Sequence, residues 1–181
     1  MSLTLFAHPF SSYCQKVLIS LYENGTPFTM RLLDHQDPET LAEFHALWPL
    51  GRFPLLVDGG QLVAESSIII EHLQLHHPGP ARLIPADPRA ALETRFLDRF
   101  FDNYVHTPLQ KVVLDAIREP SQRDAKGVGD ARAGLETAYA WLDRHMAGRD
   151  WAAGEQFSLA DCSAAPALFY ADWTQPIGAA F

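Results

Sequence analysis

The sequence predicts an α/β domain with the element order β-α-β-α-β-β-α, followed by an all-helical domain. Residues 3–6 alternate in the way typical of a half-buried strand. Asp58-Gly59-Gly60, between two short apolar runs, has the chemistry of a hairpin turn. A proline-rich stretch follows, and every later apolar pattern has the helical period. We therefore expect one domain at 1–78, a linker at 79–87 and a helical domain at 88–181.

The first helix is expected from about residue 13, and Gly25 stands where a left-handed cap would end it. Ser12 and Gln15 fit a capping box at its start. If Ser12 is the cap, the hydroxyl of Ser11 is free at the helix mouth, beside unpaired backbone N–H groups and the positive end of the helix dipole. This is a place to hold an anion. One buried stripe of the helix is formed by Cys14, Val17, Leu18, Leu21 and Tyr22.

The rest of the first domain follows from local signals. Asp37-Pro38 is a cap followed by proline at the first helical position. The loop before the hairpin contains two prolines that forbid helix. The expected elements are a strand at 28–33, a helix from 38 to about 48, a loop at 48–54, strands at 55–57 and 61–63, and a helix at 68–77.

The helical domain also shows its helix boundaries. Asp87-Pro88 begins a long aromatic helix that Pro108 should kink or interrupt. A polar stretch at 126–129 is expected to precede the next helix, which ends near Gly148. The last helix begins with a capping box formed by Ser158 and Asp161.

Composition narrows the class of protein. The 181 residues carry a formal net charge of −8, with no basic stripe of the kind that nucleic acids require. No apolar run is long enough to cross a bilayer, and there is no signal-peptide pattern at the start. Cys14 and Cys162 both fall on apolar helix faces, which fits a reducing compartment. We expect a cytoplasmic globular protein with no nucleic-acid or membrane partner.

Four segments, in this order and spacing, resemble those of the soluble (cytosolic) glutathione transferases, including bacterial ones. Residues 11–17, Ser-Ser-Tyr-Cys-Gln-Lys-Val, look like the active-site serine segment of the zeta and theta classes. Residues 49–54 match the P-x-G-x-[VI]-P loop of that family, in which the last proline is cis. Residues 65–66 match its Glu-Ser pair, and residues 158–161 match its [ST]-x-A-D capping box.

The resemblance implies a thioredoxin-like first domain and a glutathione transferase activity, with glutathione as co-substrate, no metal, and a homodimer. Ser11 takes the catalytic position, and Phe10 and Tyr104 are candidate walls of a pocket for the hydrophobic electrophile. Phe53 would contribute its backbone to the cysteinyl part of glutathione through strand-like pairing. The residues expected to bind glutathione are Ser11, Ser12, Gln36, Arg52, Phe53, Pro54, Glu65 and Ser66.

Two departures from the family pattern stand out. Trp48 replaces the usual asparagine before the loop, and Phe53 replaces valine or isoleucine, which a backbone contact tolerates. The sequence given ends at Phe181, whereas the family has further helices, so we expect the second domain to be shortened at its C-terminus.

The chemistry requires a glutathione thiolate, because the thiol is a poor nucleophile. A cysteine pKa of about 8.5 leaves only about 3% thiolate at pH 7, and a fall of two units raises this to roughly 75%. That shift corresponds to about 2.7 kcal/mol. A charge-assisted hydrogen bond from Ser11, at roughly 1.5–3 kcal/mol, and a helix N-terminus, at up to about 2 kcal/mol, are sufficient to supply it.

Several alternatives remain open on the sequence alone. The pair of serines also suits a glutathione-dependent cis/trans isomerase of a small unsaturated acid, and the fold also suits a non-catalytic glutathione-binding or interaction module. Cys14 resembles a cysteine of the C-x-x-C redox enzymes but fits a buried structural thiol better. The pairing of His8 with Ser11 suggests a hydrolase, but without a nucleophile-elbow pattern. The histidines of the third helix, His72, His76 and His77, include a zinc-like i, i+4 pair but lack a third ligand, which favours an ordinary helix face.

Overall fold

The computed structural model describes residues 3–178, which form two compact units that divide after Pro85. The first unit contains the sheet and the second is helical throughout. No helix among the described residues is both long and apolar enough to span a bilayer.

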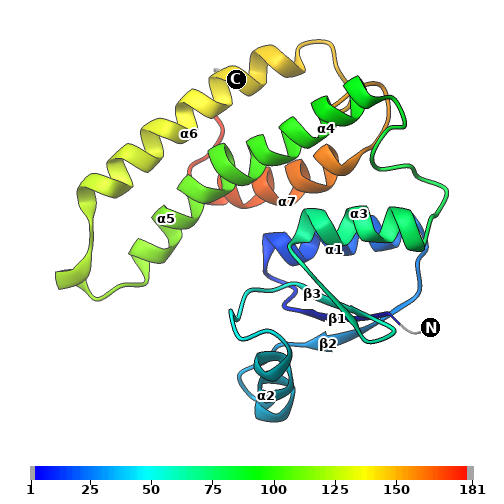
Figure 1. Cartoon of the computed structure of the whole chain (residues 1–181). Coiled ribbons are helices and arrows are strands. Elements are labelled where there is room, and N and C mark those ends of the chain that lie inside the picture. The colour runs from blue at the N-terminus through cyan, green and yellow to red at the C-terminus, as the bar shows by residue number, and fades with distance from the viewer. Residues whose placement is uncertain (1–2, 179–181) are drawn as a thin grey trace. The chain divides into compact units, whose positions relative to one another are not determined.

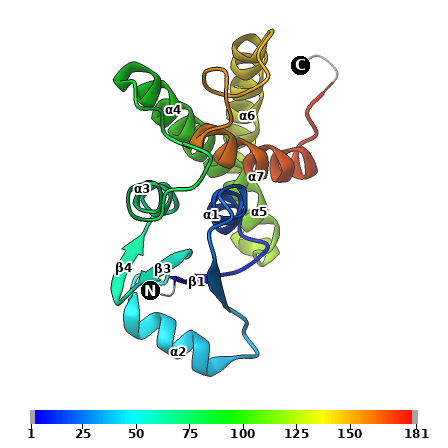
Figure 2. The same ribbon diagram turned by 90° about the vertical axis from the view of Figure 1, so that its right-hand side faces the viewer.

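The first unit has the predicted order β-α-β-α-β-β-α. Its strand order is β2-β1-β3-β4, with β1 parallel to β2 and antiparallel to β3. Helices α1 and α3 lie side by side on one face of the sheet, and α2 covers the other face (Figures 1 and 2). The elements are β1 (Leu3–Ala7), α1 (Ser12–Glu23), β2 (Phe28–Leu32), α2 (Pro38–Leu47), β3 (Leu55–Asp58), β4 (Gln61–Ala64) and α3 (Ser66–His76).

The two central strands carry the core of the sheet. Leu5, Phe6 and Ala7 of β1 and Leu55 and Leu56 of β3 are almost completely buried, because helices cover both faces at this point. The edge strand β2 instead leaves Met30 and Leu32 partly exposed. The predicted hairpin is confirmed: Gly59 and Gly60 have positive φ angles of 56° and 94°, which glycine adopts readily.

The second unit packs α4 against α7 and α5 against α6. Leu97, Phe101, Val105, Leu135 and Tyr139 are among its most buried side chains. Its elements are α4 (Pro88–Phe100), a π-helical segment (Phe101–His106), α5 (Thr107–Ala116), a short 3₁₀ turn (Pro120–Gln122), α6 (Ala125–Met146) and α7 (Leu159–Thr174).

The predicted interruption of the aromatic helix is confirmed, but it lies just before the proline. The π-helical segment ends at His106, directly before α5, and Pro108 lies in the first turn of α5. Because Pro108 has no N–H, the carbonyl four residues earlier cannot form its helical bond. The carbonyl of Asp102 in the widened turn accepts both the N–H and the hydroxyl of Thr107, the latter at 2.9 Å.

The start of α6 corrects one prediction. The polar stretch at 126–129 lies within the helix, which begins at Ala125, and not before it. The reason is Asp124, whose Oδ1 accepts a hydrogen bond from the N–H of Gly127 at 2.8 Å and caps the helix. This cap stabilises a glycine-containing first turn of low intrinsic helix propensity.

The capping box of α7 is confirmed and extends beyond its own helix. Oδ2 of Asp161 accepts hydrogen bonds from the backbone N–H and the hydroxyl of Ser158, both at 2.9 Å. Its Oδ1 accepts a third bond from the N–H of Ala152, at 2.8 Å, in the preceding loop. One buried carboxylate therefore satisfies two backbone donors and fixes the loop onto the helix start.

We expect Asp161→Ala to destabilise the second unit by about 2–4 kcal/mol, because it removes a cap and leaves two buried N–H groups without partners. Chemical denaturation of the two proteins measures this change. Asp150→Ala is the matched control: it removes an exposed carboxylate from the same loop and should change stability by less than about 0.5 kcal/mol. Equal losses in both variants would contradict the assignment.

Candidate functional site

Strand register brings the predicted site segments to one edge of the sheet. Phe6 pairs with Leu55, and Leu55 pairs with Ala64, so the end of β1, the start of β3 and the end of β4 are neighbours. Ala7 pairs with Leu32, so the end of the parallel strand β2 lies at this edge too. We call this edge the Ser11 edge; it comprises residues 8–11, 33–36, 52–54 and 65–66.

At the Ser11 edge, Ser11 itself is the N-cap of α1. Its backbone is extended, with φ −82° and ψ 122°, and its Oγ accepts a hydrogen bond from the N–H of Cys14 at 3.3 Å. The prediction that Ser12 caps this helix is therefore wrong. The side chain of Gln15 donates from its Nε2 to the carbonyl of Pro9 at 2.9 Å. Ser12 is the first helical residue and is buried.

The thiol of Cys14 lies directly behind Ser11 and is fully buried. Burial raises the pKa of this thiol above its ordinary value, and this outweighs the hydrogen bonds from the N–H of His8 and from the side chain of Ser11, which lower it. The N–H of His8 donates to Sγ at 3.4 Å. Cys14 is thus held as a neutral thiol, which agrees with a structural role.

His8 does not form the hydrolase pair considered above. Its Nδ1 accepts a hydrogen bond from the N–H of Phe10 at 3.2 Å, so this ring nitrogen is used within its own turn. Its carbonyl accepts the N–H of Ser11 at 3.0 Å. Both contacts shape the turn that presents Ser11 at the start of α1.

A second helix start, that of α3, also opens at the Ser11 edge. Glu65 precedes this helix with a φ of 69°, the only positive φ of a residue other than glycine among residues 3–178. Its exposed side chain makes no capping bond. A strained backbone of this kind costs about 1–3 kcal/mol and is typical of functional sites. Ser66, the first helical residue, is buried at the positive end of the helix dipole.

A buried lysine joins the two helices, and sequence reasoning missed it. Lys16 on α1 is 1% exposed, and its Nζ donates to Oγ of Ser67 on α3 at 2.9 Å. Its place on the apolar side of α1, beside Cys14 and Val17, was the available signal. The ammonium adds positive charge close to the N-terminus of α3.

The loop before β3 places the remaining predicted residues of this edge. The bond between Phe53 and Pro54 is cis, Pro54 is buried, and Phe53 is 40% exposed with its ring against that of Phe44. Arg52 and Gln36 are both exposed. Trp48, the departure from the family pattern, packs against the apolar cluster of Phe6, Leu33, Phe44 and Leu55.

The two predicted wall residues of the electrophile pocket belong to different units. Phe10 is 78% exposed in the first unit, and its ring lies 5.6 Å from that of His8. Tyr104 lies in the π-helical segment of the second unit, is 59% exposed, and contacts the ring of Phe100. Their exposure leaves both rings accessible to an apolar ligand.

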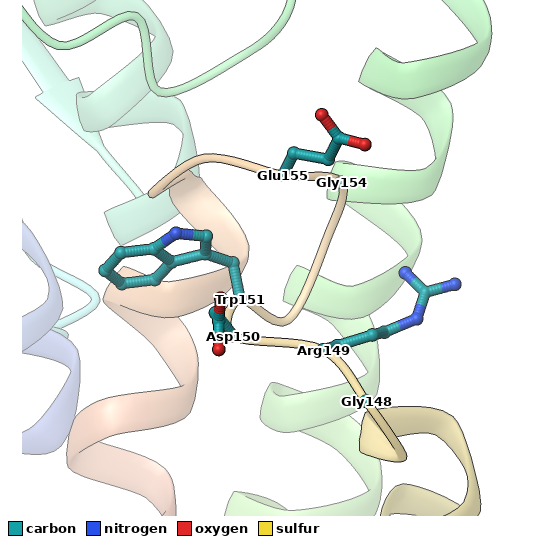
Figure 3. Close-up of a pocket in the computed structure, with 6 residues that line it drawn as sticks. All are labelled: Gly148, Arg149, Asp150, Trp151, Gly154 and Glu155. Carbon is teal, nitrogen blue, oxygen red and sulfur yellow. The ribbon is translucent and has the colours of Figure 1, made fainter.

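A separate hollow lies in the second unit, in the loop between α6 and α7 (Figure 3). Its volume is about 570 Å³, and none of the predicted site residues lines it. Trp151 and Arg149 project from opposite sides of this loop (Figure 3). The lining residues are Gly148, Arg149, Asp150, Trp151, Gly154 and Glu155.

Comparison with known proteins identifies the family. Residues 5–81 match the family described as "Glutathione S-transferase, N-terminal domain", and residues 113–176 match "Glutathione S-transferase, C-terminal domain". Glutathione S-transferase 1 of Dianthus caryophyllus is 32% identical over 171 residues, which cover 91% of this chain and 75% of that protein. The chain belongs to the glutathione S-transferase family.

Solved structures of glutathione S-transferases match the fold across both units. One from Methylobacillus flagellatus with glutathione bound superposes with a TM-score of 0.84 at 28% identity, over 95% of this chain and 84% of that one. Another, from Methylobacterium radiotolerans in complex with glutathione sulfonate, gives 0.81 at 30% identity, over 94% and 79%. The predicted fold class, thioredoxin-like and then all-helical, is confirmed.

The relatives of this glutathione S-transferase chain also include a protein named for its location. FtsZ-localized protein A of Caulobacter vibrioides is 29% identical over 183 residues, which cover 94% of this chain and 77% of that protein. Membership of the family is therefore compatible with more than one kind of role.

Because both cysteines are buried and burial raises the pKa of Cys14, we expect neither thiol to react readily in the folded chain. At pH 7 a maleimide should label both at least about 100-fold more slowly than in the chain unfolded by guanidinium, since labelling requires local opening. Mass spectrometry of the labelled protein measures this. Rapid labelling of Cys14 in a Cys162→Ala variant would instead make Cys14 a candidate nucleophile.

Proposed function

We propose that this chain is a glutathione transferase that joins the thiolate of glutathione to a small hydrophobic electrophile. The observation that carries the proposal is the position of Ser11, at the start of α1, on the same edge as the start of α3. Two helix N-termini at one edge suit a ligand with two negative groups, the thiolate and the α-carboxylate of the γ-glutamyl residue.

Ser11 would activate the thiol as a hydrogen-bond donor. Its Oγ is held in place by the N–H of Cys14, while a hydroxyl retains one rotatable proton. Two sulfurs compete for this proton, but the buried Cys14 thiol is neutral and a weak acceptor, whereas the glutathione thiolate is charged. The bound thiolate therefore receives the stronger bond, and water or buffer takes the thiol proton.

The γ-glutamyl end of glutathione fits the start of α3. Its α-carboxylate would meet the hydroxyl and N–H of Ser66, with the ammonium of Lys16 close behind. Its own ammonium would pair with the exposed carboxylate of Glu65, which is not used as a helix cap. The cysteinyl part would pair with the backbone of Phe53 beside Pro54. Ser12, Gln36 and Arg52 are further candidates for polar contacts.

Family membership supports a wider assignment. We propose a homodimer that acts in the cytoplasm in detoxification, with a serine-type site like that of the zeta and theta classes and the domain limits expected above. Phe10 and Tyr104 are the candidates for contact with the electrophile, as their exposed rings suit an apolar group.

The second candidate function is a glutathione-binding module without turnover. Two observations favour it: the side chain of Ser11 already hydrogen-bonds to the thiol of Cys14, and one relative is named FtsZ-localized protein A. Such a module would bind glutathione with its thiol pKa unshifted. The pKa of the bound thiol therefore separates the two functions.

We expect Ser11→Ala to raise the pKa of the bound glutathione thiol by about 1–2 units, because it removes a charge-assisted bond of about 1.5–3 kcal/mol. Transfer to a chlorodinitrobenzene below pH 7 should fall about 10- to 100-fold. Ultraviolet titration of the bound thiolate measures the shift. An unshifted thiol in the wild-type chain would favour the binding module.

Two further variants separate chemistry from stability. Ser11→Gly also removes the hydroxyl, but glycine is tolerated as a cap, so it should lose the same thiol shift at little cost in stability. Ser20→Ala is the matched control: it removes another hydroxyl of α1, one that donates to the carbonyl of Val17, and should leave the thiol pKa unchanged. If Ser20→Ala reproduces the Ser11 effect, the loss reflects helix damage.

Product analysis with a small cis-unsaturated acid tests isomerase activity.

We expect Glu65→Gln to weaken glutathione binding about 10- to 100-fold, as it removes the carboxylate proposed to pair with the ligand's ammonium. Calorimetry with glutathione and with an analogue lacking the amino group measures this. The substitution should weaken binding of the analogue only slightly, because the analogue lacks the ammonium with which Glu65 would pair. A loss of equal size with both ligands would contradict this pairing.

A further inference from the structure

At the end of the sheet opposite to the Ser11 edge, three potential metal ligands converge. Oδ2 of Asp58, the last residue of β3, lies 2.9 Å from Nε2 of His72 and 2.6 Å from Nε2 of His77. The ligand atoms of all three side chains lie within 4.8 Å of one another. We call Asp58, His72 and His77 the Asp58 cluster.

The sequence did not reveal this cluster, because it suggested the wrong histidine pair and no carboxylate. The i, i+4 spacing favours His72 with His76, but α3 ends at His76 and the backbone of His77 leaves the helix, with φ −134°. That change of direction brings the ring of His77 to the carboxylate, whereas His76 remains exposed. Asp58 directly precedes the hairpin turn, where an aspartate is expected for turn chemistry alone.

We propose that the Asp58 cluster binds one divalent transition-metal ion, with Zn²⁺ the ion that fits best. Two imidazole nitrogens and one carboxylate oxygen are a recognised zinc ligand set, and water would complete a four-coordinate site. The ion would take the place of the hydrogens now shared between Oδ2 and the two rings. Each ring would then present an unprotonated Nε2 and carry its proton on Nδ1.

The second oxygen of Asp58 supports this proposal independently. Oδ1 is buried and has no hydrogen-bond partner among the residues described, 3–178. Buried carboxylate oxygens are usually satisfied, so an unpartnered one calls for an explanation. A metal ion held by both oxygens, or the water bound to that ion, provides the missing partner.

Distances, burial and charge also fit an ion. Ligand atoms around tetrahedral zinc are about 3.3 Å apart for bonds of about 2.0 Å, so the distances from Oδ2 to the two histidine nitrogens, now 2.9 and 2.6 Å, have to lengthen by less than about 1 Å. The side chains of His72 and Asp58 are 8% and 11% exposed, and that of His77 is 26% exposed, which leaves a way in. His77 caps the C-terminus of α3, where the helix dipole favours a cation.

The proposed metal site is independent of the proposed glutathione site. The 11 residues of α3 separate the two, a length of about 16 Å at 1.5 Å per residue. The ion would tie the β3–β4 hairpin to the end of α3 within the first unit. Ser11→Ala should therefore bind zinc as the wild-type chain does, whatever its effect on the glutathione thiol.

The test uses the full chain, stripped with a chelator and dialysed in the absence of glutathione, whose thiol also binds zinc. Competition with a chromophoric chelator gives the Zn²⁺ affinity and stoichiometry, and Co²⁺ substitution reports the coordination number. We expect one Zn²⁺ per chain and the intense visible absorption of four-coordinate Co²⁺. His77→Ala and Asp58→Asn should each weaken zinc binding by at least about 100-fold. Loss of a residue that only hydrogen-bonds to a metal ligand already lowers metal affinity about 10- to 100-fold, and these two residues would bind the ion directly.

His76→Ala is the matched control, because it removes a neighbouring exposed histidine that lies outside the cluster. It should change zinc affinity by less than about threefold. A loss as large as that of His77→Ala would show surface chelation by adjacent histidines and overturn the proposal, as would binding of less than one ion per chain. Circular dichroism checks folding. If Asp58→Asn unfolds, the partly exposed His77→Ala and the wild-type Co²⁺ spectrum decide the question.

Discussion

The pairing of β1 with β3 is the constraint on which the rest of the first unit depends. It sets Phe6 opposite Leu55 and thereby brings the turn after β1 beside the loop before β3. A slip of one residue would turn the buried side chains of either strand to the other face, so the nearly complete burial of Leu5, Leu55 and Leu56 holds the register. The apolar core thus determines where the polar segments of the Ser11 edge meet.

The electrostatic potential at the Ser11 edge is locally positive, although the chain as a whole is negatively charged. The formal net charge is −8, which disfavours an anionic ligand at long range. The starts of α1 and α3 and the ammonium of Lys16 supply positive potential where it is needed, and burial of Lys16 protects its contribution from screening by salt. A negative protein can therefore hold a negative ligand without a basic surface. Two local features of this arrangement lower the stability of the fold: the strained backbone of Glu65 and the buried ammonium of Lys16.

Sequence reasoning succeeded where the signal lies within a few residues. The hairpin at Gly59 and Gly60, the capping box of Asp161 and the interruption near Pro108 all follow from short-range chemistry, and together they gave the correct fold class. It failed by one residue at Ser11, because adjacent serines are equally good caps and only the preceding turn decides between them. Lys16 with Ser67, and Asp58 with two histidines, join residues 51, 14 and 19 positions apart, which a linear pattern does not reveal. The roles of the site residues remain predictions.

The two ends of α3 explain how one helix can serve two opposite charges. Its N-terminus at Ser66 carries the positive end of the helix dipole, which attracts the carboxylate of a ligand. Its C-terminus has unpaired carbonyls and the buried carboxylate of Asp58 nearby, an environment that attracts a cation. The β3–β4 hairpin connects these ends, since β4 leads into the N-terminus while its turn lies against the C-terminus. An ion bound at the Asp58 cluster would tie the hairpin turn to the C-terminal end of α3, and it would lie too far from the other end of the helix to touch the ligand.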